Sequence, residues 1–282
     1  MSINALSLSP GGMKNAFSAG VLKGLQLDRE LIDKVYAASS GLVPALSFLT
    51  DQQDGAKELW INNLIKGRMR LGWPPLNLDR LTGIVEQHFL GHDLTEGRMQ
   101  LFFRVITESG EIKSIPVTQS NLVVATRAAF ALPVLCPEVN YEGEVCYDGM
   151  IGETLPLQLI QDARDETRRL LLIHHSLLEK RDLKSESWLY RFILKRRPKL
   201  LVVFQQSIED HNAAIDLIRR LDGDGQLYVI SPDATGVPTS RTLERSKKRL
   251  DADFELGEGV GRRHHINVSR FLKGESPTIL SG

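Results

Sequence analysis

This chain of 282 residues has few of the features that point directly to a protein class. It has only two cysteines, Cys136 and Cys146, which are too few for a disulfide framework and lack the spacing of a metal site. Its 35 basic and 35 acidic residues balance, so its composition provides no general attraction to polyanions. We therefore expect a protein of a reducing compartment that binds neither a metal nor nucleic acid.

Long apolar runs are absent as well. No stretch approaches the roughly 18 apolar residues of a membrane-spanning helix. The strand-like run at residues 3–8 follows the N-terminus at once, with neither a basic segment nor a cleavable apolar segment before it. These absences predict a cytoplasmic protein whose contact with a membrane would be peripheral.

One segment has the composition for a peripheral contact of that kind. Its apolar residues recur at helical spacing among clustered cations, namely Trp188, Leu189, Phe192 and Ile193 with Arg191, Lys195, Arg196, Arg197 and Lys199. As a helix it could lie on an anionic bilayer, where each cation near the surface contributes about 1 kcal/mol. The alternative is an amphipathic helix whose aromatic side faces the protein core.

Strand-like and helical segments alternate along the chain, which is typical of an α/β fold built around a parallel sheet. We expect strands at residues 3–8, 35–37, 102–107, 111–117, 145–148, 170–173 and 227–230. Helices are expected at residues 16–27, 42–49, 56–65, 78–90, 122–130, 155–163, 187–221 and 241–272. No repeat or linker interrupts them, so we expect a single domain over residues 1–282, whose last quarter, about 233–282, is a mainly helical C-terminal extension.

Two short segments have the composition of turns that lead from a strand into a helix. Residues 9–15 read Ser-Pro-Gly-Gly-Met-Lys-Asn after the first strand, and residues 37–41 read Ala-Ala-Ser-Ser-Gly at the end of the second. Glycines in the first turn can direct backbone N–H groups toward an anion. A serine in the second would sit on a tight elbow at a helix N-terminus, where the helix dipole favours its anionic form.

Acyl transfer requires two turns of this kind. Attack of a serine oxygen on an ester carbonyl creates an oxyanion, and one preorganised N–H donor contributes roughly 3 to 4 kcal/mol to its stability. Ser39 has the elbow's two-residue spacing to Gly41, whereas Ser40 has the position of a helix N-terminal hydroxyl. The nucleophile also needs a base, and Asp148 is a candidate because it ends a strand-like segment just before Gly149.

In composition and order, these three motifs resemble those of the patatin family. Residues 9–25 are similar to the family's Gly-rich oxyanion segment, residues 37–41 to its Gly-x-Ser-x-Gly elbow, and residues 148–149 to its Asp-Gly motif. The resemblance extends over nearly the whole chain, with further similar segments at residues 125–133, 211–218 and 226–232.

The resemblance implies an α/β fold of three layers, with a central, mostly parallel sheet flanked by helices. It also implies a lipid acyl hydrolase of the phospholipase A, lysophospholipase or esterase type, which needs no cofactor, acts on a lipid or acyl ester and forms an acyl-enzyme. The site residues that it implies are the nucleophile Ser39, the base Asp148 and the oxyanion segment Gly11, Gly12, Met13 and Lys14. Lys14 stands where the family has Arg or Lys, and its cation can hold the loop or raise the positive potential near the oxyanion.

The chain departs from the family pattern at three positions. The family's first glycine is Pro10, which has no N–H and cannot donate to an oxyanion. The glycine after the basic residue is Asn15, which tolerates left-handed backbone angles and is a good N-cap. The glycine two residues before the nucleophile is Ala37, the smallest replacement. None of the three removes a reactive group.

Two alternatives to the Ser-Asp dyad remain open from the sequence. The substitutions at Pro10 and Ala37 allow a catalytically inactive module that keeps the fold for binding. A Ser-Asp-His triad is the other, because several histidines follow Asp148 in the order of that triad, namely His174, His175, His211, His264 and His265. The sequence leaves the acyl chain and the head group of the substrate unspecified.

Overall fold

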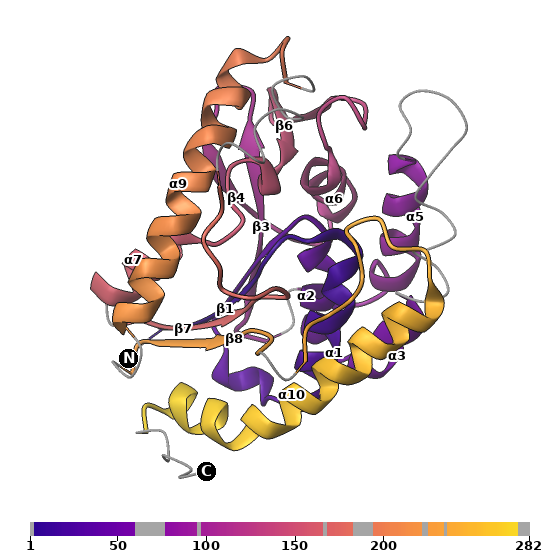
Figure 1. Ribbon diagram of the computed structural model, residues 1–282. Coiled ribbons are helices and arrows are strands. Elements are labelled where there is room, and N and C mark those ends of the chain that lie inside the picture. Colours follow the sequence, from indigo (N-terminus) through magenta and orange to yellow (C-terminus); the bar gives the residue numbers. More distant parts are fainter. Residues whose placement is uncertain are drawn as a thin grey trace.

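The computed structural model describes residues 3–59, 77–94, 97–165, 168–182, 194–221, 225–233 and 236–275. Within these residues, an eight-stranded sheet has the order β5-β6-β3-β2-β1-β7-β8, with β4 paired to β3 (Figure 1). The strands are β1 (Ile3–Leu8), β2 (Lys34–Ala38), β3 (Gln100–Thr107), β4 (Ile112–Pro116), β5 (Val139–Tyr141), β6 (Glu144–Asp148), β7 (Arg168–Ile173) and β8 (Leu227–Ile230). The run β3-β2-β1-β7-β8 is parallel, and β4, β5 and β6 pair antiparallel. The expected mostly parallel sheet is confirmed.

Helices cover both faces of this sheet. One face is packed by α1 (Asn15–Leu25), α2 (Leu42–Leu49), α3 (Gln53–Glu58), α5 (Leu78–Phe89), α6 (Leu122–Phe130) and α10 (Lys247–Lys273). The other face is packed by α7 (Leu157–Asp165) and α9 (Pro198–Leu221). Side chains alternate along β1, so Leu6 and Leu8 point to the first face and Ala5 to the second. The chain thus has the expected three-layer α/β fold.

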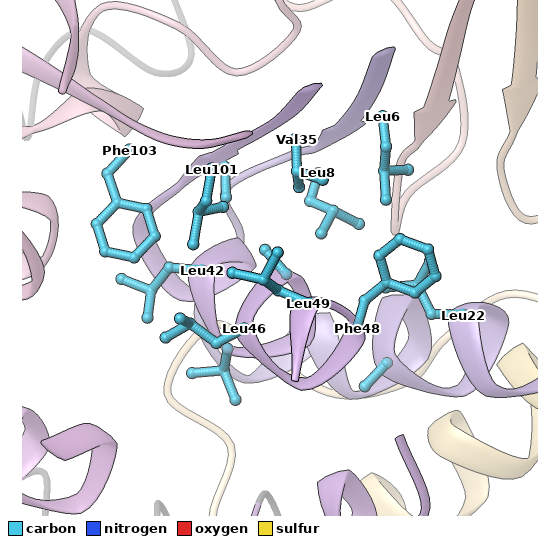
Figure 2. Packing of buried hydrophobic residues seen from close by; sticks show 14 of the residues in the cluster. Leu6, Leu8, Leu22, Val35, Leu42, Leu46, Phe48, Leu49, Leu101 and Phe103 are labelled. Atoms are coloured by element: carbon cyan, nitrogen blue, oxygen red, sulfur yellow. The ribbon is translucent and has the colours of Figure 1, made fainter. Parts of the chain in front are cut away.

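Helix α2 is buried on every side. All eight residues from Leu42 to Leu49 are buried, and a helix that is apolar all round is stable only inside a core. Figure 2 shows this packing, with strand residues such as Leu8 and Leu101 facing helix residues such as Leu46 and Phe48. Because α2 directly follows the serine turn, its burial fixes the position of that turn.

The C-terminal helix α10 packs against α1 through facing glycines. A Cβ atom at Gly20 would lie 2.0 Å from the carbonyl oxygen of Phe254, and one at Gly257 would lie 2.1 Å from that of Phe17. The two backbones are therefore in direct contact, and any side chain at these positions would push the helices apart. Helix α1 begins directly after the Gly-rich turn, so its packing against α10 also helps to hold that turn in place.

Most expected elements are confirmed, and four have the predicted bounds: β1, α2, α6 and β8. The short strand β5 was not expected. The helix expected from residue 16 to residue 27 ends at Leu25, because Gln26 adopts a left-handed conformation with φ of 45°. The helix expected at residues 241–272 begins only at Lys247, where the Ser246 hydroxyl caps it by accepting a hydrogen bond from Arg249 N.

The segment expected to contact a membrane is described only in part. Trp188, Leu189, Phe192 and Ile193 lie outside the described residues, as do residues 60–65 of another expected helix. The expected continuous helix at residues 187–221 is wrong at residues 194–196, which form a turn, and α9 begins at Pro198. Proline favours the first position of a helix and disfavours helical angles in the residue before it.

Arg197 was one of the cations expected to contact an anionic bilayer, but its charge is paired within the protein. Its guanidinium pairs with Glu108 at 3.1 Å and with Glu138, and it lies 4.9 Å from the ring centre of Tyr147. These contacts connect the start of α9 to β6 and to the residues next to β3 and β5. In the described part of the chain, no helix combines the length and apolar character that crossing a membrane requires.

Candidate active site

Ser39 lies at a sharp turn between β2 and α2. It opens a short 3-10 helix, Ser39–Gly41, and has φ of 50°, a left-handed angle that is uncommon for a residue with a side chain. Such strain persists only where the surrounding structure enforces it. A Cβ atom at Gly41 would lie 2.9 Å from the carbonyl oxygen of Leu8, so the turn is pressed against the end of β1. These features are those of a nucleophile elbow.

Asp148 lies at the end of β6, which runs antiparallel to β2 and ends close to the end of β2. Strand β4 occupies one edge of β3 over Phe102–Ile106, so β2 and β6 must share the other edge. Ala38, at the end of β2, pairs with Arg104, and Asp148, at the end of β6, pairs with the next residue, Val105. The two strands therefore meet end to end along β3, which brings Ser39 next to Asp148.

The Asp148 carboxyl is buried and only partly hydrogen-bonded. Its Oδ1 accepts a hydrogen bond from Met150 N at 2.9 Å, whereas Oδ2 has no hydrogen-bond partner among the described residues. Burial raises the pKa of Asp148 to about 7, while the nearby Ser39 hydroxyl and the Met150 N–H act in the opposite direction. A base whose pKa lies close to neutral is well matched to proton transfer from a serine.

The Gly-rich turn is enclosed from two sides. A Cβ atom at Gly11 would lie 1.9 Å from Nε2 of His175, and one at Gly12, where φ is +59°, would lie 2.3 Å from the carbonyl oxygen of Thr242. The Met13 N–H donates to that same Thr242 oxygen at 3.0 Å, so it would have to leave Thr242 before binding an oxyanion. The Gly11 and Gly12 N–H groups have no hydrogen-bond partner among the described residues.

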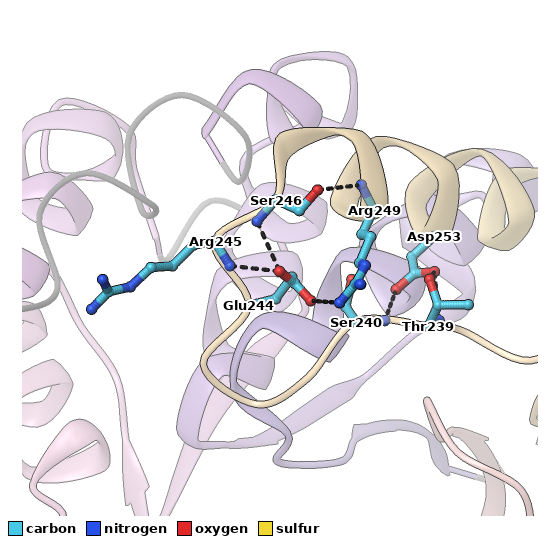
Figure 3. Close-up of polar contacts among 7 residues, drawn as sticks. All are labelled: Thr239, Ser240, Glu244, Arg245, Ser246, Arg249 and Asp253. Atoms are coloured by element: carbon cyan, nitrogen blue, oxygen red, sulfur yellow. Dashed lines mark hydrogen bonds and ion pairs between the residues drawn. The ribbon is translucent and has the colours of Figure 1, made fainter.

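The segment at residues 239–246, which carries Thr242, is held in place by two carboxylates (Figure 3). Asp253, buried on α10, accepts hydrogen bonds from the backbone N–H groups of Thr239 and Ser240 at 2.9 and 2.8 Å. Glu244 accepts from Arg245 N and Ser246 N, and from the Arg249 side chain at 3.1 Å. These bonds fix the carbonyl of Thr242 over the Gly-rich turn.

Asn15 has a role that the sequence did not predict. It has φ of −69° and caps no helix through its side chain, so neither of the roles expected for it is observed. Instead its Nδ2 donates to Ser9 O at 3.0 Å and to Ser40 Oγ at 2.8 Å. The buried amide therefore links the Gly-rich turn to the serine turn.

Four of the five histidines expected as alternatives have partners elsewhere. The fifth, His174, has a buried Nδ1 with no hydrogen-bond partner among the described residues. His175 uses both ring nitrogens, Nε2 on Pro10 O at 2.6 Å and Nδ1 on Ser176 Oγ at 2.8 Å. His211 also uses both, on Thr154 Oγ1 and on Glu179 O. His264 contacts the Tyr228 hydroxyl and His265 the Leu25 carbonyl oxygen.

The environment keeps the histidines after β7 neutral. Burial lowers the pKa of His174 and that of His175, and the nearby cation of Lys14 adds to both effects. Lys14 thus contributes positive charge beside the Gly-rich turn. This is the only side-chain role of Lys14 seen in the part of the chain that the structure describes.

Comparison with known proteins agrees with the motifs. The family model described as patatin-like phospholipase matches residues 6–160, more than half of the chain, and this region contains both turns and Asp148. The chain belongs to the patatin-like phospholipase family. Family membership confirms the motif resemblance and supports hydrolysis of lipids as the general function of the chain.

Two further comparisons describe the rest of the chain. A domain of unknown function (DUF6363) matches residues 197–273, which include the segment at residues 239–246 and α10. The crystal structure of VipD from Legionella pneumophila matches at 11% sequence identity and a TM-score of 0.43, covering 94% of this chain and 67% of that chain. A search among curated proteins found no match.

A glycine substitution tests the Gly-rich turn. Gly12→Ala should lower kcat for a soluble p-nitrophenyl ester by about 100-fold, the effect of losing one oxyanion donor. The added methyl group would require a strained φ and would collide with the Thr242 carbonyl. Gly55→Ala is the matched control, because a Cβ atom there meets nothing within 4 Å. A Gly12→Ala enzyme with unchanged kcat would show that this turn does not serve the reaction.

Proposed function

We propose that this protein is a lipid acyl hydrolase in which Ser39 is the nucleophile and Asp148 the general base. The observation that carries the proposal is the meeting of β2 and β6 on adjacent residues of β3, which brings a strained serine beside a buried carboxyl group. The substrate class is an acyl ester of a lipid, in keeping with the family.

The first half of the reaction would acylate the enzyme. Asp148 takes the proton of Ser39 as the serine oxygen attacks the ester carbonyl carbon. The oxyanion that forms is stabilised by the N–H groups of Gly11 and Gly12, which lack other partners among the described residues. When the oxyanion collapses, the ester C–O bond breaks, and Asp148 returns the proton to the leaving alcohol.

The second half would release the fatty acid. Asp148, again ionised, takes a proton from a water molecule, which attacks the acyl-serine carbonyl. The same N–H groups stabilise the second oxyanion, and Ser39 leaves with the proton from Asp148. A dyad suffices for this cycle because one carboxyl group can serve both proton transfers in turn.

A fluorophosphonate probe tests the proposal directly. The probe phosphonylates serines that have an activated oxygen beside an oxyanion hole, and it does not react with ordinary serines. We expect stoichiometric labelling of the full chain, with the modified peptide mapping to Ser39 by mass spectrometry. Hydrolysis of a p-nitrophenyl ester, a lysophospholipid and a diacyl phospholipid should be measured on the same preparation.

The probe also separates the enzyme from an inactive binding module. Absence of labelling, under conditions where an established serine hydrolase is labelled, would favour the binding module. Labelling at Ser39 that is lost when His211 is replaced by alanine would favour a triad.

A further inference from the structure

His175 makes a hydrogen bond whose direction is fixed by chemistry. Its Nε2 lies 2.6 Å from the carbonyl oxygen of Pro10, which can only accept, so Nε2 must carry the proton. Its Nδ1 is then unprotonated and accepts from the Ser176 hydroxyl at 2.8 Å. Burial lowers the pKa of His175 to about 4, so the neutral ring persists at physiological pH.

The order of the strands shows which way the Pro10–Gly11 peptide points. Strand β1 lies between β7 and β2, and all three are parallel. His175 follows β7 and Ser39 follows β2, so the two residues flank the turn after β1 from opposite sides. In a trans peptide, the C=O and the N–H point in opposite directions. Because the Pro10 carbonyl points to His175, the Gly11 N–H points toward the side of Ser39.

This peptide would be free to turn without the histidine. Gly11 has no side chain to restrict it, and a Cβ atom there would overlap the His175 ring, with 1.9 Å to Nε2 and 2.4 Å to Cδ2. A rotated peptide would direct the Pro10 carbonyl, rather than an N–H group, toward the site. A carbonyl oxygen there would repel an oxyanion.

We propose that His175 is a positioning residue, which holds the Pro10–Gly11 peptide so that the Gly11 N–H faces the oxyanion formed at Ser39. The proposal rests on the proposed function and adds to it a residue outside the Ser39–Asp148 pair. The histidine takes no part in proton transfer, since both of its nitrogens are engaged.

Kinetics of three variants test this role. His175→Phe keeps an aromatic ring but removes the donor, so kcat for a soluble p-nitrophenyl ester should fall by about 100-fold with KM little changed. His175→Gln places an N–H donor near the position of Nε2 and should restore kcat to within about tenfold of wild type. His174→Phe is the matched control, because its buried Nδ1 has no hydrogen-bond partner among the described residues and phenylalanine keeps a ring stacked on His175, whose ring centre lies 5.0 Å away.

An NMR readout tests the proposal without relying on turnover. The sequence contains a single Pro-Gly dipeptide, Pro10-Gly11, so labelling with ¹³C-carbonyl proline and ¹⁵N-glycine leaves one HNCO cross-peak. This peak reports on the very peptide that His175 is proposed to hold. It should move in His175→Phe and stay close to the wild-type position in His175→Gln and His174→Phe.

The outcomes distinguish failure of this proposal from failure of the proposed function. An unchanged cross-peak in His175→Phe, or an unchanged kcat in that variant while Ser39→Ala is inactive, would overturn the positioning role. A wild-type chain that neither reacts with fluorophosphonate nor hydrolyses esters would refute the hydrolase, while the cross-peak would still report whether His175 holds the peptide. A loss of kcat in His175→Phe that His175→Gln does not rescue would also overturn the positioning role, because a side chain that restores the donor to Pro10 would then not restore the reaction.

Discussion

Replacing Ser39 by alanine should abolish ester hydrolysis and fluorophosphonate labelling. Without the hydroxyl no acyl-enzyme can form, so kcat should fall by at least about 10⁴-fold, the scale seen when a catalytic nucleophile is removed. The fold should survive, because the change removes a single oxygen atom from a small buried side chain, which is 6% exposed. The measurement is kcat on a p-nitrophenyl ester, together with the thermal midpoint of unfolding.

Ser40→Ala is the control for this prediction. The Ser40 hydroxyl lies one residue away and accepts a hydrogen bond from Asn15 at 2.8 Å, so its loss removes a link between the two turns and no reactive group. We expect kcat to stay within about tenfold of wild type, because a single hydrogen bond contributes about 1 kcal/mol. The assignment of the nucleophile is wrong if the two variants show the reverse pattern.

The elements that the sequence predicted well are those specified by local patterns. Helix α2 could be placed to the residue because an apolar run starts right after Gly41. Ser39 and Asp148 could be singled out because each precedes a turn with a required glycine. A Cβ atom at Gly149 would lie 2.6 Å from the Arg104 carbonyl oxygen, which shows how close another backbone comes.

The supporting contacts of the site could not be predicted in this way. Pro10 and His175 are 165 residues apart in the sequence, and they meet only because β7 pairs with β1. Hydrophobic periodicity predicts a strand at each position but does not determine which strands are neighbours. The hydrogen bond from Met13 to Thr242 likewise joins two segments that are far apart in the sequence. The charged C-terminal region has no local pattern that predicts its packing against the Gly-rich turn.

Replacing Asp148 by asparagine should lower kcat by about 100-fold or more, because the shape is kept while the proton acceptor is lost. The Met150 N–H can still donate to the remaining side-chain oxygen, so the turn should be preserved. His211→Ala is the control, because His211 lies on α9 with both ring nitrogens bonded away from the serine. An equal loss in His211→Ala would replace the dyad with a triad.

The ionisation of Asp148 also predicts a pH dependence. Its pKa is raised to about 7, and the base must be ionised to act, so kcat/KM of the wild type should fall about tenfold per pH unit below that value. The rate should be constant above it. A profile with its midpoint near the ordinary aspartate pKa would show that another group limits the rate.

The same raised pKa predicts that Asp148 reduces stability at the pH where the enzyme works. A carboxyl group with a folded-state pKa above its unfolded value binds more protons when folded, so its contribution to stability is complete below about pH 4 and is lost as the pH rises through about 7. Asparagine has no charge to bury. Asp148→Asn should therefore unfold at a higher temperature than the wild type at pH 8, and the difference should shrink toward pH 5. An asparagine variant that is both less stable at pH 8 and nearly as active would contradict the role of Asp148 as a buried, ionising base.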